Sequence, residues 1–135
     1  FLFFENLFIL FLINFNFCYN VFMEEIVINK SRFLAFKFEL QSLNQVKEIL
    51  ASLKKEHKKA THICFAYVFN KDIVSEKASD DGEPSGTAGY PILNVIKKKN
   101  CVNTMVVVVR YFGGVKLGAG GLTRAYTKAA ASVLN

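Results

Sequence analysis

All eight glycines of this 135-residue chain lie between Gly82 and Gly121, in two short segments. The first segment, residues 80–89, reads DDGEPSGTAG, and the second, residues 110–126, reads RYFGGVKLGAGGLTRAY. Glycine is favoured where the backbone takes unusual angles or approaches another group closely. Loops of this kind present backbone N–H groups that can bind anions. Because the rest of the chain contains no glycine, the placement of the glycines predicts a site built from two backbone loops.

The charge of the chain is distributed unevenly along its length. The net charge is +6, and no Asp or Glu follows Glu83. That acid-free half carries seven cations, at Lys97, Lys98, Lys99, Arg110, Lys116, Arg124 and Lys128. We therefore expect a basic face and an anionic partner such as nucleic acid or phosphate. A basic surface that is only solvated is the alternative interpretation.

The length fits one domain, which can bury a core without a disulfide or a metal. The three cysteines, Cys18, Cys64 and Cys101, are an odd number and have no C-x-x-C spacing. This pattern is typical of a reducing compartment, and we expect a cytoplasmic protein. Too few ligands are present for zinc, and the sequence predicts no metal site and no cofactor.

Residues 1–22 differ in composition from the rest, because they hold eight of the fourteen phenylalanines and a single charge, Glu5. Four asparagines interrupt the apolar run, and no Lys or Arg flanks it before Lys30. The interruptions and the missing flanking charges argue against a transmembrane helix. A signal peptide would need a basic start and a small-residue cleavage site, and this segment has neither. We expect a leader outside the domain, translated from upstream AT-rich sequence, with a domain over 23–135 that begins at Met23. No membrane partner is expected.

Periodicity predicts the order β-α-β-(β)-α-β-α. Alternation predicts a strand over 33–40, and aromatic residues indicate a second strand over 62–69, followed by a short edge strand over 72–77. Four consecutive valines, apolar on both faces, predict a buried strand over 104–112. Ser42 and Gln45 form a capping box before an amphipathic helix, Pro91 fits the first turn of a second helix, and a third apolar stripe begins at Leu122. We expect an α+β or α/β fold with two layers.

The second glycine segment follows a buried strand and precedes a helix. It is not a dinucleotide-binding fingerprint, since Thr123 replaces the third glycine and no acid follows, and it is not a P-loop. A helix start can bind phosphate through its N–H groups and dipole. The predicted anion-binding or nucleic-acid-binding residues here are Arg110, Lys116, Gly118, Gly120, Gly121 and Arg124. A tight connection without a ligand is the alternative.

The first glycine segment has a similar form, and Ser85, Gly86 and Thr87 offer N–H groups and hydroxyls before the second helix. Asp80, Asp81 and Glu83 precede them as an acidic loop. These carboxylates have two interpretations: they could hold Mg²⁺, or they could pair with cations of the other loop.

Nucleophilic catalysis is only weakly supported. Ser85 lacks the G-x-S-x-G elbow, and only His57 and His62 could serve as its base. His57 lies among lysines, where we expect it to be solvated. Cys64 lies on the same strand face as His62, but a buried structural cysteine is the usual case.

The two glycine segments, D80-D81-G-E-P-S-G-T-A-G89 and the run from Arg110 to Tyr126, resemble the signature of the IMPACT family, which includes the YigZ-type bacterial proteins. Lys30-Ser31-Arg32-Phe33 and Ala60-Thr61-His62 resemble its earlier blocks. The resemblance runs from about residue 26 to 135 and implies the IMPACT N-terminal domain. It implies a fold similar to the second domain of a small-subunit ribosomal protein, with helices on one face of the sheet and a left-handed βαβ unit.

The resemblance also implies a class of function. Bacterial members of the family usually continue into a small C-terminal domain similar to one in elongation factor G, which we expect to be absent here. Eukaryotic relatives regulate translation by restraining the kinase that senses amino-acid starvation, a stress response.

We therefore expect a non-enzymatic protein that binds RNA, the ribosome or a translation-associated protein through its basic glycine loops. The alternatives are an enzyme acting on a small phosphorylated substrate, with Asp80, Asp81 or Glu83 holding Mg²⁺ or acting as base, and a module that only binds other proteins.

Overall fold

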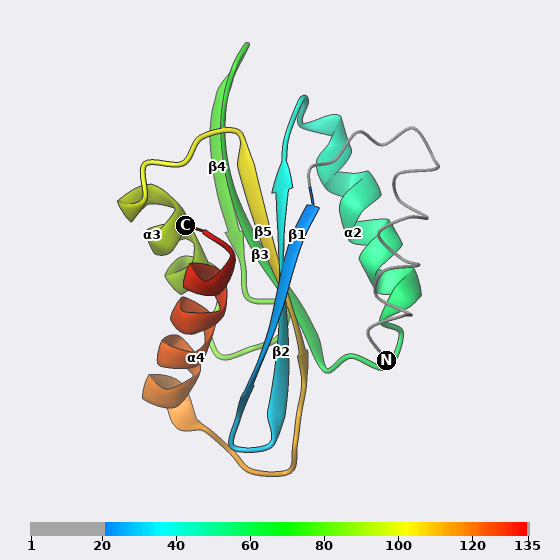
Figure 1. Ribbon diagram of the computed structural model, residues 1–135, viewed down its shortest axis with the longest axis vertical. Helices are drawn as coiled ribbons and strands as arrows, with labels where there is room; N and C mark the ends of the chain where they lie inside the picture. Colours follow the sequence, from blue (N-terminus) through cyan, green and yellow to red (C-terminus); the bar gives the residue numbers. More distant parts are fainter. Residues whose placement is uncertain (1–20, 135) are drawn as a thin grey trace.

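The structure is a computed structural model that describes residues 21–134. Five strands and three helices follow one another along this part of the chain (Figure 1). In chain order they are β1 (Val21–Ile28), β2 (Ser31–Glu39), α2 (Asn44–Glu56), β3 (His62–Asn70), β4 (Val74–Ser79), α3 (Gly89–Lys98), β5 (Thr104–Tyr111) and α4 (Gly118–Val133). Among these helices, none is long and apolar enough to span a membrane.

The five strands form one sheet in the order β1-β2-β5-β3-β4, and all neighbours are antiparallel. β5 lies at the centre, and all of its residues except Tyr111 are buried. Its four consecutive valines alternate between two hydrophobic clusters, with Val106 and Val108 in one and Val107 and Val109 in the other. The prediction of a central strand covered on both faces is therefore confirmed.

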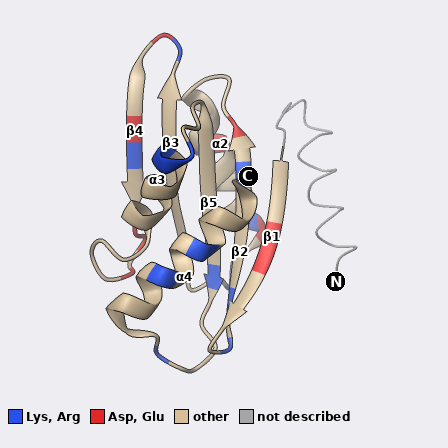
Figure 2. Ribbon diagram, turned by 60° about the vertical axis from the view of Figure 1, so that its left-hand side comes forward, with Lys and Arg blue, Asp and Glu red and all other residues tan. Residues whose placement is uncertain are grey.

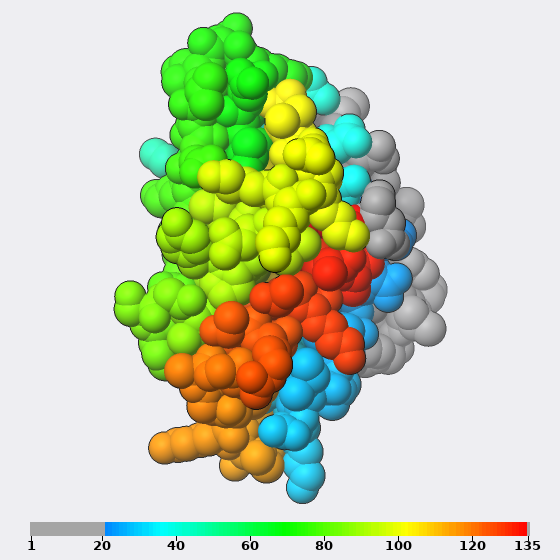
Figure 3. All heavy atoms as spheres, turned by 90° about the vertical axis from the view of Figure 1, so that its left-hand side faces the viewer, coloured from blue at the N-terminus to red at the C-terminus, as the bar shows by residue number. Residues whose placement is uncertain are grey.

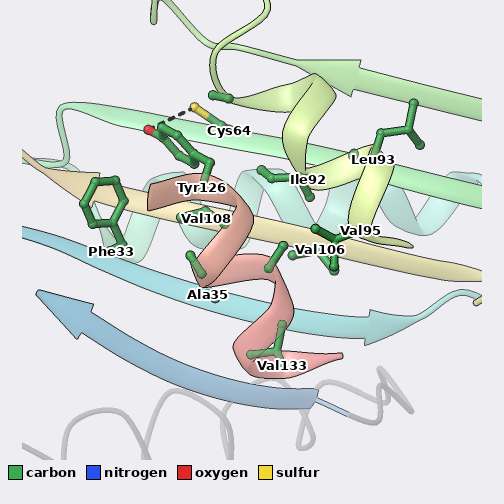
Figure 4. Close-up of a cluster of buried hydrophobic side chains, with 14 of the residues drawn as sticks. Phe33, Ala35, Cys64, Ile92, Leu93, Val95, Val106, Val108, Tyr126 and Val133 are labelled. Carbon is green, nitrogen blue, oxygen red and sulfur yellow. Dashed lines mark hydrogen bonds between the residues drawn. The ribbon is translucent and has the colours of Figure 1, made fainter. Parts of the chain in front are cut away.

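Helices cover both faces of the sheet. Residues of α3 and α4 share one cluster with Val106 and Val108, shown in Figure 4, whereas Ile49 and Leu53 of α2 join the cluster on the opposite face. Figure 1 shows α2 on one side of the sheet and the other two helices across from it. The α+β class holds, but the expectation of two layers is corrected to three because α2 has its own apolar stripe to bury.

The topology contains two crossover connections of opposite hand. The first connection joins the parallel strands β2 and β3 through α2, and β5 lies between these strands in the sheet. The second joins the parallel strands β4 and β5 through α3, and β3 lies between them. If each crossover is viewed in the plane of the sheet with its two strands pointing up, both crossovers move in the same direction across the sheet. Their helices, however, lie on opposite faces. One of them is therefore left-handed, against the usual preference for right-handed connections.

Most predicted elements form within a few residues of their predicted bounds. The capping box of α2 is only half formed: Gln45 Oε1 accepts the N–H groups of Gln41 (2.6 Å) and Ser42 (3.3 Å), but Leu43 is the N-cap residue. β1 was not predicted, and Val21 and Phe22 pair there with β2. Residues 1–20 of the predicted leader lie outside the described residues.

Candidate functional site

The two glycine segments fold into neighbouring loops at one end of the sheet. The first connects β4 to α3, and the second connects β5 to α4. Both border an open cavity of about 440 Å³, together with the start of β3. Its lining residues are Thr61, His62, Glu83, Pro84, Arg110, Phe112, Lys116, Leu117, Gly118, Ala119 and Leu122.

The first loop is closed by the carboxylate of Asp80. Asp80 Oδ2 accepts the N–H of Gly86 (2.9 Å), and Oδ1 accepts those of Ala88 (3.1 Å) and Gly89 (2.8 Å). Burial opposes ionisation, but these three donors outweigh it and lower the pKa of Asp80 below its usual value. Of the predicted residues Ser85, Gly86 and Thr87, Gly86 therefore already donates its N–H to an internal anion, and the N–H of Thr87 donates to the carbonyl of Pro84. The hydroxyl of Thr87 donates to the carbonyl of Pro84 (2.6 Å), and Ser85 is exposed.

Asp81 joins this loop to the sheet. Its Oδ2 accepts the backbone N–H of Ile63 at 2.7 Å, and its carbonyl oxygen lies 2.7 Å from Nδ1 of His62. The backbone at Asp81 and Gly82 has positive φ angles of 43° and 85°, which turns the chain back toward β3. The role that the structure gives Asp81 is to fix the loop.

Glu83 is buried and lies among three side chains from different elements. Its Oε2 accepts Nη1 of Arg110 at 2.8 Å and the hydroxyl of Tyr126 at 2.5 Å, while Nε2 of His62 lies 3.3 Å from Oε1. Arg110 is only 5% exposed, and its Nη2 donates to the hydroxyl of Ser31 at 3.2 Å. The interpretation in which the two loops pair through opposite charges therefore holds for Arg110 and Glu83.

The three acidic residues do not converge on a common point. Asp80 faces the start of α3, Asp81 faces β3, and Glu83 faces β5 and α4. Within residues 21–134, no group of three or more His, Cys, Asp and Glu side chains is arranged to hold a metal ion. The carboxylates instead serve as internal acceptors that tie the loops to the sheet.

The second loop passes close to the β1–β2 hairpin. A Cβ atom on Gly113 would lie 2.0 Å from the carbonyl oxygen of Lys30, so only glycine fits there. Gly114 and Gly118 have φ angles of 93° and 73°. The chain then enters α4 at Gly118, one turn before the predicted start of the apolar stripe at Leu122.

The start of α4 has an open N-terminus. Leu117 is the N-cap residue, and the first turn of the helix contains no acidic residue. Lys116 is exposed and borders the cavity beside Gly118. The guanidinium of Arg124 extends toward the first turn of the helix, where its Nη1 lies 3.3 Å from the position that a Cβ atom on Gly120 would take. The helix start therefore has the Arg124 guanidinium over its first turn and Lys116 two residues before Gly118, without a neutralising carboxylate in the turn.

Cys64 and His57 have structural surroundings. Burial raises the pKa of the Cys64 thiol to about 12, and its Sγ lies 3.5 Å from the hydroxyl of Tyr126 (Figure 4). His57 is not solvated as predicted: its Nδ1 lies 2.6 Å from the hydroxyl of Tyr111, and its ring packs against Phe36. Burial, with Arg32 nearby, lowers the pKa of His57. Neither group has the surroundings of an activated nucleophile or base.

Sequence reasoning missed the part that Tyr126 and Ser31 play. Tyr126 was predicted as part of the apolar stripe of the last helix, and its ring is indeed fully buried. A buried tyrosine hydroxyl requires a hydrogen-bond partner, and that requirement was a signal for a nearby carboxylate. Ser31 carries no comparable signal, because its contact with Arg110 joins residues 79 positions apart.

Comparison with known proteins gives consistent matches. Residues 29–134 match the family model of the Impact N-terminal domain. The chain is 51% identical over 111 residues to the IMPACT family member YvyE of Bacillus subtilis, covering 82% of this chain and 51% of that protein. It is 41% identical over 101 residues to the IMPACT family member YigZ of Escherichia coli, covering 73% and 50% respectively. The chain thus spans about half the length of these curated relatives.

Two solved structures share the fold. A crystal structure of a hypothetical protein superposes with a TM-score of 0.79 at 36% identity, over 84% of this chain and 56% of the other. The structure of Yih1, described as a two-domain translational regulator, superposes with a TM-score of 0.58 at 26% identity, over 85% of this chain and 46% of Yih1.

Proposed function

Because the chain belongs to the IMPACT family through its Impact N-terminal domain, we propose that it regulates translation by binding the phosphate backbone of RNA at the start of α4. Two kinds of observation support the proposal. One is the similarity to a protein described as a translational regulator. The other is the chemistry of the site, where an open helix start lies beside exposed cations.

The observation that carries the proposal is the pairing state of the cations. Arg110 is buried against Glu83 and is not available to a ligand. Lys116 and Arg124, in contrast, are exposed and have no ion pair with any residue in the described part of the chain. The N–H groups and dipole of the first turn of α4 lie between them in sequence. A phosphate there would gain charge and hydrogen bonds at once.

A module that binds only other proteins is the second candidate. It is favoured by the loop itself, in which Phe112 is 47% exposed and Val115 is 42% exposed. Large apolar side chains on a loop beside a cavity are a common feature of protein-binding surfaces. The two candidates differ in what the cations contribute, since phosphate contacts depend on them and apolar contacts do not.

The test is a double substitution, Lys116→Ala with Arg124→Ala. We expect it to weaken binding to RNA by about 2–4 kcal/mol, because two charge-assisted contacts are lost, while the fold is retained because both side chains are exposed. The matched control replaces Lys54 and Lys58, two exposed lysines of the α2 side, by alanine. RNA affinity that is unchanged in a folded Lys116/Arg124 variant would overturn the proposal in favour of the protein-binding module.

A further inference from the structure

We propose that the groove between α3 and α4 binds single-stranded RNA, with one base stacked on Tyr90 and the adjoining phosphates on Lys98 and Lys99. This inference rests on the proposed function and extends it from RNA phosphates in general to single-stranded RNA. The groove has a volume of about 350 Å³, and it is lined by residues of α3, of α4 and of the loop that also borders the cavity described above. Figure 3 views the face on which the two helices lie side by side.

Tyr90 is the first observation. It lies in the first turn of α3, and 61% of it is exposed even though its neighbours Gly89 and Pro91 are buried. An aromatic ring on a groove wall offers a flat surface on which an unpaired base can stack. A base inside a duplex is already stacked and paired, so this contact selects a single strand.

The charge of the groove is the second observation. Lys98 and Lys99 line it, and neither α3 nor α4 contains an acidic residue. Lys97 does not contribute to this positive charge, because its Nζ is paired with the carboxylate of Glu76 of β4 at 3.3 Å. In Figure 2 the ribbons of α3 and α4 carry blue Lys and Arg positions and no red Asp or Glu position. The groove therefore complements a polyanion better than it complements an acidic or apolar peptide segment.

Polar side chains between these groups complete the groove. Asn94 comes from α3, and Thr123 and Thr127 come from α4. Asn94 can both donate to and accept from a base edge, and the hydroxyl of Thr127 can contact phosphate or the ribose 2′-hydroxyl. The hydroxyl of Thr123 already donates to the carbonyl of Ala119 at 3.0 Å, so it is left to accept a hydrogen bond from a base or a ribose hydroxyl.

The groove and the proposed anion site are bordered by the same loop and the same helix, although they share no lining residue. Gly86 borders the groove, and Glu83 and Pro84 of the same loop border the cavity. The first two turns of α4 likewise supply Gly118 to the cavity and Thr123 to the groove. One RNA strand that follows this loop and helix start can reach both surfaces.

The experiment measures the affinity of the full chain for a labelled ten-nucleotide oligouridylate and for an RNA duplex of the same length. We expect Tyr90→Ala to weaken binding of the single strand by about 5- to 150-fold, the range of one stacking contact, and to change duplex affinity by less than about twofold. Tyr90→Phe keeps the ring and is expected to retain the affinity of the unsubstituted chain. Lys98→Ala with Lys99→Ala should weaken binding of both RNAs.

Two outcomes overturn the inference: unchanged single-strand affinity in a folded Tyr90→Ala variant, or an equal loss for single strand and duplex. Either result leaves the proposed function standing if the Lys116/Arg124 variant still loses RNA affinity. If that variant binds RNA normally while Tyr90→Ala does not, the groove is retained as the RNA site and the proposed site at the start of α4 fails. A chain that binds neither RNA refutes both proposals.

Discussion

Glu83 shows how a single residue shapes the site. Its carboxylate is buried among Arg110, Tyr126 and His62, which come from β5, α4 and β3. A buried carboxylate is costly unless it is paired and hydrogen-bonded, and these contacts meet that requirement. The loop between β4 and α3 is therefore fixed to three elements of the fold, and Arg110 becomes a structural group rather than a ligand for phosphate.

Replacing Arg110 by methionine should lower the free energy of unfolding by about 3–5 kcal/mol, because the Glu83 carboxylate stays buried without its main partner. Urea denaturation measures this loss. The control is Arg32→Met, which breaks a pair with Glu25 whose side chains are 35% and 25% exposed. That change should cost less than about 1 kcal/mol. Equal losses in the two variants would contradict the structural role of Arg110.

At the scale of elements, α3 is stabilised by a residue that lies outside it. The N-cap residue of α3 is Ala88, which has no capping side chain, but Asp80 accepts hydrogen bonds from Gly86, Ala88 and Gly89. Asp80 thus acts as a cap supplied from eight positions upstream.

Asp80→Ala should lower the free energy of unfolding by about 1–2 kcal/mol at pH 7, as is typical when a capping group is lost. The pKa of Asp80 is lowered in the folded protein from 3.8, so its contribution is complete above that pH and is lost as the pH falls through the folded value. The difference from the unsubstituted chain should shrink below pH 3.8. Asp72→Ala, in an exposed turn, serves as the control. A difference that stays constant down to pH 2 would argue against this cap.

Elements with a strong periodic pattern were predictable, and those defined by partners were not. The run of valines predicted β5, and Pro91 predicted the first turn of α3. Both signals were readable because the hydrophobicity of a segment and the fixed φ of a proline belong to the local sequence. β1 was missed because Glu24 and Glu25 interrupt the alternation of an edge strand that is held by β2. At the site, the positions of the glycines predicted both loops. They did not predict where the Asp80 carboxylate points, because that depends on a loop that brings Gly89 back to Asp80 across nine positions.

The whole molecule separates its helices between two faces. α3 and α4 bring four candidate phosphate contacts to one face, at Lys98, Lys99, Arg124 and the adjacent Lys116, whereas α2 lies across the sheet. The handedness of the crossovers follows from this division, and no local pattern in the sequence predicts it. The same division gives one side of the sheet these four exposed cations of the acid-free half, which supports the proposed function.

Binding of RNA phosphates at the start of α4 can be measured through the salt dependence of RNA affinity. Four phosphate contacts, at about 0.7 per contact for a single strand, predict a slope of about −3 for the logarithm of the association constant against the logarithm of salt concentration. The Lys116/Arg124 double variant should reduce that slope by about half. A slope near zero in the unsubstituted chain, or an equal slope in the double variant, would contradict binding of RNA phosphates at the start of α4.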